Sequence, residues 1–161
     1  MKAFNYSKIQ LGSLVLLRVL IGWHFLYEGL AKLLNPYWSA SGFLLDSQGF
    51  AKGLFEWMAK TESVLEVVNF LNVWGLILVG LGLMLGLLSR WAAFGGIVML
   101  TFFYLSHPPF IGAEYLLPSE GNYLLVNKNL IELAALIVLL LFPTSREIGL
   151  DRLIYFKKSS S

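Results

Sequence analysis

Residues 18–32, RVLIGWHFLYEGLAK, place four ionisable side chains inside an apolar run long enough to cross a bilayer. At about 100° per residue, Arg18, His24, Glu28 and Lys32 share one face of a helix, and the last three are spaced so that neighbours can touch. An ionisable group in hydrocarbon costs about 2.5–3.5 kcal/mol on insertion scales. The polar face is therefore expected to look into a helical bundle or a polar cavity.

The composition indicates an integral membrane protein. Hydrophobic residues make up 57% of the 161 residues and charged residues only 14%, whereas soluble domains contain about 25% charge. The net charge of +2 is too small to indicate a nucleic-acid partner. The absence of cysteine excludes disulfide exchange, thiolate nucleophiles and cysteine-ligated iron–sulfur clusters in this chain. Any redox role then needs a bound cofactor, a quinone or a partner.

Four apolar segments predict an all-α protein with a single domain over residues 1–161. The spans are expected at about 11–34, 69–88, 91–106 and 124–142, and they would form an up-down-up-down four-helix bundle in the membrane. Only Ser89 and Arg90 separate the second span from the third, which predicts a tight antiparallel hairpin.

The first outer loop is expected to contain an amphipathic helix over about residues 50–66. Phe50, Leu54, Trp57 and Met58 recur at helical spacing and would form one apolar face. Such a helix would lie at the level of the lipid headgroups and cap the outer end of the bundle.

Polar residues of the other spans are expected to meet the first span in the outer half of the bundle. The second span begins with Asn72, the third ends with Tyr104 and His107, and the fourth carries Asn129 and Glu132 on one face. Together these residues predict a polar intramembrane pocket, a feature that is usually functional. The sequence has no metal-ligand signature, and no metal is expected.

Structural roles are alternatives for the same side chains. Glu28 with Lys32, and Glu132 with Lys128, are each spaced i, i+4 and could neutralise one another.

Arg18 could pin the bundle instead of binding a ligand, and His24 could be a hydrogen-bonded structural group. Haem ligation by His24 and His107 would require both at one depth. His24 lies about 12 Å below the outer end of its helix, whereas His107 lies at the interface, so haem is not expected.

Three stretches resemble the DoxX/DoxD family of small four-helix membrane proteins. They are RVLIGWHFLYEGLAKLLNPYW at 18–38, the glycine-rich second span followed by Arg90, and NKNLIELAALIVLLLF at 127–142. The positions that match the family pattern are Arg18, Gly29, Lys32, Asn129 and Glu132. Family members are similar to the membrane subunit of thiosulfate:quinone oxidoreductase, although the absence of cysteine argues against persulfide chemistry in this chain.

The resemblance implies a membrane subunit that binds quinone in its outer half and passes electrons to it from an extracytoplasmic partner or substrate. Glu28 and Glu132 would be the catalytic residues that relay protons. The side chains expected to bind the quinone are Arg18, His24, Lys32, Asn72, Tyr104, His107 and Asn129. The expected partners are the lipid bilayer and either a partner oxidoreductase or further copies of the chain.

Two other classes of function remain open from the sequence. The chain could be a non-enzymatic membrane anchor or assembly factor that docks a partner through its outer loop. A solute or proton pathway is disfavoured, because the polar residues crowd one half of the membrane instead of crossing it.

Basic residues predict a multi-pass protein of the inner (cytoplasmic) membrane with both termini cytoplasmic. One side carries Lys2, Lys8, Arg90, Arg146, Arg152, Lys157 and Lys158, and the other carries Lys32, Lys52, Lys60 and Lys128. A reporter fused after Ser161 is expected to be active only if it is of the kind that works in the cytoplasm. Activity of a periplasm-specific reporter at that site would reverse the orientation.

Overall fold

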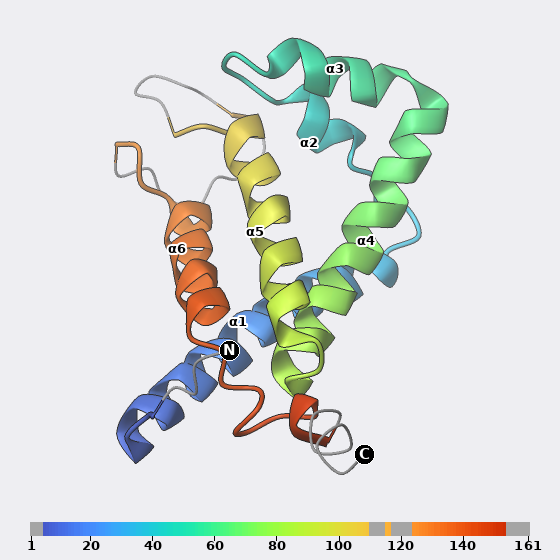
Figure 1. The fold of residues 1–161 in the computed structure, drawn as a ribbon. Coiled ribbons are helices and arrows are strands. Elements are labelled where there is room, and N and C mark those ends of the chain that lie inside the picture. The colour runs from blue at the N-terminus through green and yellow to red at the C-terminus, as the bar shows by residue number, and fades with distance from the viewer. Residues whose placement is uncertain (1–4, 110–114, 117–123, 154–161) are drawn as a thin grey trace.

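The computed structural model describes residues 5–109, 115–116 and 124–153. Within these ranges the chain forms six α-helices and no β-strand, which confirms the all-helical class. The helices, labelled in Figure 1, are α1 (Lys8–Leu33), α2 (Ser41–Leu45), α3 (Lys52–Lys60), α4 (Glu62–Leu85), α5 (Ser89–Ser106) and α6 (Lys128–Leu141).

Side-chain caps explain where two of these helices begin. At the start of α1 the Ser7 hydroxyl accepts from the backbone N–H of Gln10, and the Gln10 side chain accepts from the N–H of Ser7. At the start of α6 the Asn127 side chain accepts from the N–H of Leu130 at 3.0 Å. The expected fourth span therefore starts later than residue 124, because Leu124 has a left-handed backbone and Asn127 is the cap.

The four longer helices pack around one apolar core. α1 crosses obliquely and packs mainly on α4, α5 lies between α4 and α6, and α6 also touches α1 (Figure 1). The buried side chains of this core come from all four helices, namely Ile21, Phe25, Leu76, Val79, Leu83, Ala93, Leu100, Leu136 and Leu139.

Helices α1 and α4 run antiparallel in close contact. Gly22 lies against Met84, and Gly29, further along α1, lies against Ile77, which is earlier in α4. A methyl group added at Gly29 would come within 2.9 Å of the backbone nitrogen of Ile77. Glycine at these positions is what allows the two backbones to approach.

Two of the described helices, α1 with 26 residues and α4 with 24, are long and apolar enough to cross a membrane. α5 has 18 residues and α6 has 14, which correspond to about 27 Å and about 21 Å of helix. The hydrocarbon core of a bilayer is about 30 Å thick, so α6 is shorter than a full span.

The helix that contains the second expected span has different bounds from the expected 69–88. α4 begins at Glu62 instead of residue 69, because the polar turns containing Glu62 and Glu66 continue the same helix. It ends at Leu85, because Gly86 adopts a left-handed conformation with φ 63° and the N–H of Leu87 donates back to the Gly82 carbonyl at 3.0 Å. Residues 86–88 form the turn, and the expected linkers Ser89 and Arg90 belong to α5.

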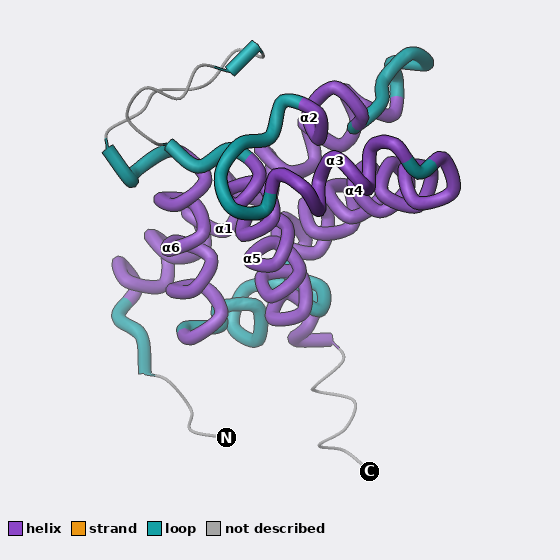
Figure 2. Tube along the Cα trace, turned by 90° about the horizontal axis from the view of Figure 1, so that it is seen from above, coloured by secondary structure: helices purple, strands orange, loops and turns teal. Residues whose placement is uncertain are grey.

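The helix expected over residues 50–66 is divided at Thr61, whose extended backbone separates α3 from α4. α2 and α3 pack on the start of α4 and the end of α5, on the opposite side of α5 from α6 (Figure 2). The end of the molecule that carries α2 and α3 is called its outer end below. The buried residues of this smaller core are Ala40, Leu44 and Phe55.

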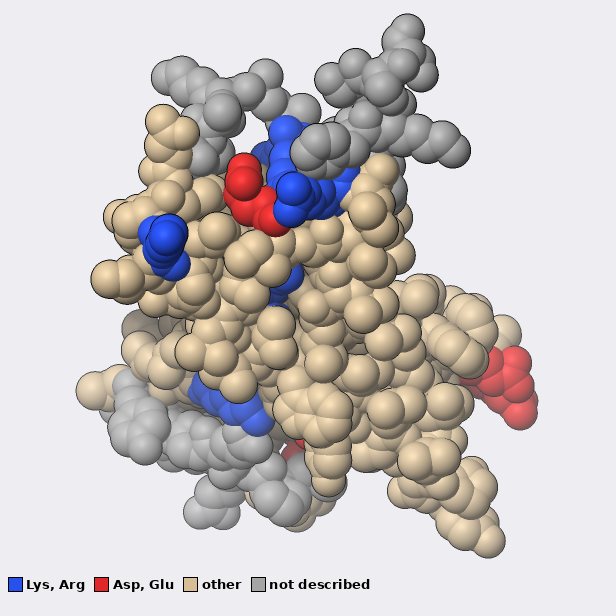
Figure 3. Space-filling model, turned by 90° about the horizontal axis from the view of Figure 1, so that it is seen from below, with Lys and Arg blue, Asp and Glu red and all other residues tan. Residues whose placement is uncertain are grey.

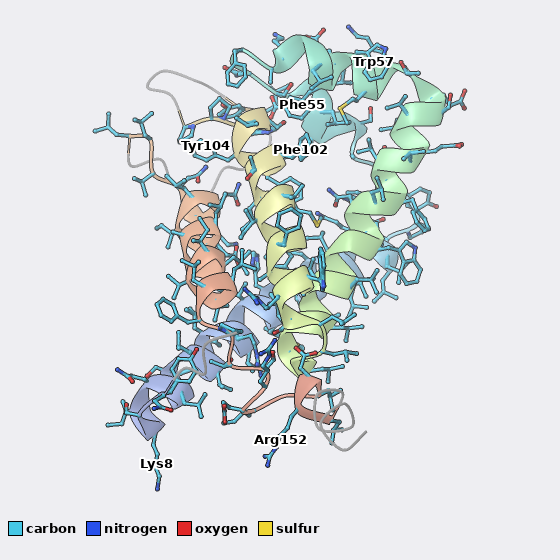
Figure 4. All side chains as sticks on the ribbon, in the orientation of Figure 1. Lys8, Phe55, Trp57, Phe102, Tyr104 and Arg152 are labelled. Atoms are coloured by element: carbon cyan, nitrogen blue, oxygen red, sulfur yellow. The ribbon has the colours of Figure 1, made fainter. Side chains whose placement is uncertain are left out.

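The apolar face expected for this segment is largely exposed in the structure. Phe50, Leu54 and Trp57 are exposed, whereas Phe55 is buried and Met58 packs beside it. In Figure 4 Phe55 lies on the side of α3 toward α5, and Trp57 lies on the outer side. The helix has two apolar faces, and periodicity alone does not tell which of them packs on the protein.

Substitution of Gly80 tests the α1–α4 contact. A Cβ at Gly80 would lie 2.5 Å from the backbone nitrogen of Leu26, so Gly80→Ala is expected to lower the free energy of unfolding by about 1 kcal/mol or more. Gly12→Ala is the matched control. Gly12 lies in α1, the partner helix of the same contact, but no atom lies within 4 Å of the Cβ that alanine would add there. Alanine's helix propensity should leave this control unchanged or stabilised by up to about 1 kcal/mol. Equal thermal stability of the two variants in detergent would contradict the contact.

Candidate functional site

A direct contact between α1 and α6 lies within the apolar core region. Nδ1 of His24 is 2.8 Å from Oε1 of Glu132, although the two residues are 108 positions apart. Because a carboxylate can only accept, the imidazole donates from Nδ1 and keeps Nε2 for another partner. The side chain of His24 is 31% exposed and that of Glu132 is 10% exposed.

The second oxygen of Glu132 is buried and has no hydrogen-bond partner. A buried polar atom without a partner costs about 1–3 kcal/mol, and such atoms are rare in folded proteins. The ion pair of Glu132 is with His24, and Lys128 does not take that place. Glu28, half-buried one turn beyond His24, makes no direct ion pair with Lys32 among the described residues. Glu132 is therefore paired across helices with His24, whereas Glu28 and Lys32 interact through their charges without a direct contact.

Lys32, at the outer end of α1, is held by α4 and by aromatic rings. Its ammonium donates to Oδ1 of Asn72 at 3.0 Å and lies 5.3 Å and 5.6 Å from the ring centroids of Trp38 and Phe103. A cation over aromatic faces is stabilised when it is shielded from water. One helical turn earlier in α4, Asn69 accepts from the N–H of Ala40 at 2.8 Å.

Arg18 lies near the middle of α1, on the other side of His24 from Lys32, and it is only 3% exposed. Its guanidinium donates to the Thr144 hydroxyl at 3.1 Å and to the Ile148 carbonyl at 2.8 Å. These contacts tie α1 to the segment after α6, and they favour the pinning role over ligand binding.

Asp151 is a buried structural carboxylate that the sequence analysis did not single out. It accepts from the backbone N–H groups of Leu88 and Ser89 at 2.7 and 3.3 Å, and so caps the first turn of α5. The cap comes from a residue 62 positions away from Ser89, and so it leaves no local signal in the sequence.

His107 belongs to a separate cluster at the outer end of α5. Its ring stacks on Phe43 with centroids 4.0 Å apart, lies 4.7 Å from the ring of Tyr115, and places Nε2 3.6 Å from Oδ2 of Asp46. Burial lowers the pKa of His107, and the carboxylate of Asp46 only partly offsets this effect.

The remaining two expected site residues are Tyr104, near the end of α5, and Asn129, at the start of α6. The Tyr104 hydroxyl donates to the Leu125 carbonyl at 2.8 Å, which ties α5 to the segment before α6. Asn129 is half-buried in the first turn of α6.

The structure divides the expected single pocket into separate groups. His24 and Lys32 are eight residues apart on α1, about 12 Å along the helix. Lys32 is instead connected to His107 through Phe103 and Phe43, whose ring centroids are 5.9 Å apart.

The two histidines have different partners and are not brought together as a pair of haem ligands. In the part of the chain that the structure describes, no group of three or more His, Asp or Glu side chains is placed to hold a metal ion.

The fold and the apolar helices define a helical membrane protein. The chain belongs to the DoxX family, because the DoxX family model matches residues 13–108, which reach from α1 to the residues after α5. Proteins of this family are often associated with oxidoreductase and quinone systems. No curated protein and no solved structure matches the chain.

Acidification is expected to destabilise the outer cluster through His107. Because burial holds its pKa below the ordinary value of 6.5, the unfolded state binds this proton more readily, and the free energy of unfolding falls as pH drops below that value. Thermal unfolding between about pH 5 and 7.5 should show this loss in the native protein and a smaller one in His107→Gln. Identical pH profiles for the two proteins would contradict the assignment.

Proposed function

We propose that this protein is a membrane subunit of an oxidoreductase and that it binds a quinone beside the His24–Glu132 pair. α1, α4, α5 and α6 would be the four spans of an up-down-up-down bundle, with α2 and α3 at the extracytoplasmic end. Electrons would come from an extracytoplasmic partner or substrate. The association of the DoxX family with quinone systems supports this proposal.

The buried, unpartnered oxygen of Glu132 is the observation that carries the proposal. A purely structural histidine–carboxylate pair would be expected to satisfy both carboxylate oxygens, because leaving one without a partner in an apolar core costs free energy. Here Oε1 of Glu132 orients the imidazole, and Oε2 has no hydrogen-bond partner within the protein. This donor set fits a ligand that exchanges protons.

A bound quinone supplies the two-electron, two-proton chemistry that the side chains of this chain cannot perform. His24 would donate its Nε2 proton to a quinone oxygen as the quinone is reduced, and a proton from the outer surface would then restore the imidazolium. Glu132 would orient the ring and stabilise the imidazolium from the Nδ1 side. Glu28, half-buried one turn further out, is placed to pass protons from the outer surface toward His24.

Lys32 and Asn72 lie too far along α1 and α4 to bond the same ring as His24. They would instead border the outer entrance of the site, where the ammonium is already held by two aromatic rings.

The distribution of charge supports an orientation with both ends of the chain in the cytoplasm. Lys8 and Arg152 lie at one end of the molecule, and Trp57 lies at the other (Figure 4). The lower face, which belongs to the Lys8 end, shows more Lys and Arg than acidic side chains (Figure 3). Cytoplasmic ends of membrane helices carry this excess of basic residues.

The double variant His24→Gln/Glu132→Gln tests the proposal. Two amides of similar size can still hydrogen-bond across α1 and α6, so the variant should insert and keep its thermal stability. It cannot exchange protons, and the quinone extracted per mole of purified protein should fall at least about tenfold, which corresponds to losing one charge-assisted hydrogen bond.

The matched control removes a similar pair of charges from the surface. Glu56→Gln/Lys60→Gln neutralises an exposed ion pair of 3.0 Å on α3 and should leave the quinone content unchanged. Unchanged quinone in the His24/Glu132 variant would refute the proposed site. Absence of quinone from the native protein would favour the alternative of a membrane anchor or assembly factor.

A further inference from the structure

An open hollow of 410 Å³ lies beside the segment that connects α2 to α3. Its walls come from that segment, the start of α3 and the short segment 115–116, and they consist of Leu45, Asp46, Ser47, Gln48, Gly49, Lys52 and Leu116. The volume is in the range of small-molecule sites. None of these residues takes part in the proposed quinone site.

Ser47 is a buried wall residue with an unsatisfied hydroxyl. It is 1% exposed, and its Oγ has no hydrogen-bond partner. The neighbouring backbone is held firmly, because the N–H of Gln48 donates to the Ser106 carbonyl at 3.0 Å. A buried hydroxyl without a partner in the wall of a hollow has an unmet hydrogen-bonding capacity that a polar group bound against that wall would satisfy.

Asp46 gives the hollow a negative charge. Its Oδ1 accepts from the backbone N–H of Leu116 at 3.0 Å, and its Oδ2 lies 3.6 Å from Nε2 of His107. Burial keeps His107 in its neutral form at neutral pH. The carboxylate of Asp46 is therefore bonded but keeps its charge.

Lys52, at the start of α3, gives the wall of the hollow a positive charge. Its ammonium lies 3.7 Å from Glu56, which is also bonded to Lys60 at 3.0 Å. One carboxylate is thus shared by two ammonium groups, and this side of α3 keeps an excess of one positive charge.

The rim of the hollow is apolar and exposed. Leu45 is 48% exposed, Leu116 is 93% exposed, and the neighbouring Phe50 is 86% exposed. A free polar metabolite would leave these side chains uncovered, whereas the acyl chains of a lipid would cover them.

We propose that this hollow binds the headgroup of a phospholipid that carries both a phosphate and a primary ammonium, as phosphatidylethanolamine does. The phosphate faces Lys52, and the ammonium faces Asp46 and Ser47. The acyl chains lie over Leu45, Phe50 and Leu116. The site holds the outer segment and α3 to the membrane surface, and it is independent of quinone binding.

A primary ammonium fits this site better than a quaternary one. Three N–H groups can donate to the carboxylate of Asp46 and to the hydroxyl of Ser47, whereas choline has no N–H to donate. Phosphatidylglycerol has no cation at all and would face Asp46 with its own negative charge unpaired. The charge pattern therefore predicts selectivity and not only general lipid affinity.

The test measures lipid binding to the full chain in detergent by native mass spectrometry. The probes are dioleoyl phosphatidylethanolamine, phosphatidylcholine and phosphatidylglycerol. We expect the ethanolamine lipid to bind about tenfold more tightly than the choline lipid, since one charge-assisted hydrogen bond has about that effect. Ser47→Ala should remove most of this preference without loss of thermal stability, because the hydroxyl has no partner within the protein.

Lys52→Gln and Lys60→Gln form a matched pair. Both lysines share Glu56, but only Lys52 lines the hollow, so only Lys52→Gln should weaken binding of the ethanolamine lipid. Equal affinity for the ethanolamine and choline lipids, or equal effects of the two lysine variants, would overturn the site. Soluble glycerophosphoethanolamine that binds as tightly as the whole lipid would overturn the assignment to a membrane lipid. Quinone content measured on the same samples should not change, which separates this result from the function proposed above.

Discussion

The close contact between α1 and α4 is the constraint on which the arrangement of the other helices depends. Glycine at positions 22, 29 and 80 lets two backbones approach to a distance at which a single methyl group would collide. Because Gly22 and Gly29 lie on the side of α1 that faces α4, the contact also sets how far α1 is rotated about its axis. That rotation turns His24 toward α6 and Lys32 toward Asn72 of α4. A looser contact would let the polar side of α1 face lipid.

The same rotation gives each ionisable group of α1 a different partner. Arg18 meets a hydroxyl and a carbonyl from the segment after α6, His24 meets a carboxylate, and Lys32 meets an amide and two aromatic rings. Lys32 donates to an acceptor, and Arg18 has acceptors for both terminal nitrogens but none for its buried Nε. At the contact between them it is an acceptor, the second carboxylate oxygen of Glu132, that is left without a partner. An unmatched carboxylate oxygen beside an imidazole can take part in proton exchange, whereas a guanidinium stays charged, so chemistry is best assigned to the His24–Glu132 contact.

The sequence predicted the helical class, the family and the polar face of α1, because composition and periodicity report on local structure. It located the start of α4 poorly, since Glu62 and Glu66 resemble loop residues although the helix continues through them. The partners within the site could not be found this way. His24 and Glu132 are 108 positions apart, and Asp151 caps α5 from the far end of the described chain. Which side chains meet depends on helix rotation, and that follows from packing over the whole molecule.

The contacts of Arg18 have a consequence for how the protein is made. Its two acceptors lie 126 and 130 positions later in the chain, so α1 enters the membrane long before either has been synthesised. During that interval the guanidinium must remain hydrated or reach the headgroups, as long basic side chains do. α1 can therefore settle at its final depth only after the segment containing Thr144 and Ile148 has emerged. The contacts of the first helix are thus completed only when a segment more than a hundred residues later has been synthesised.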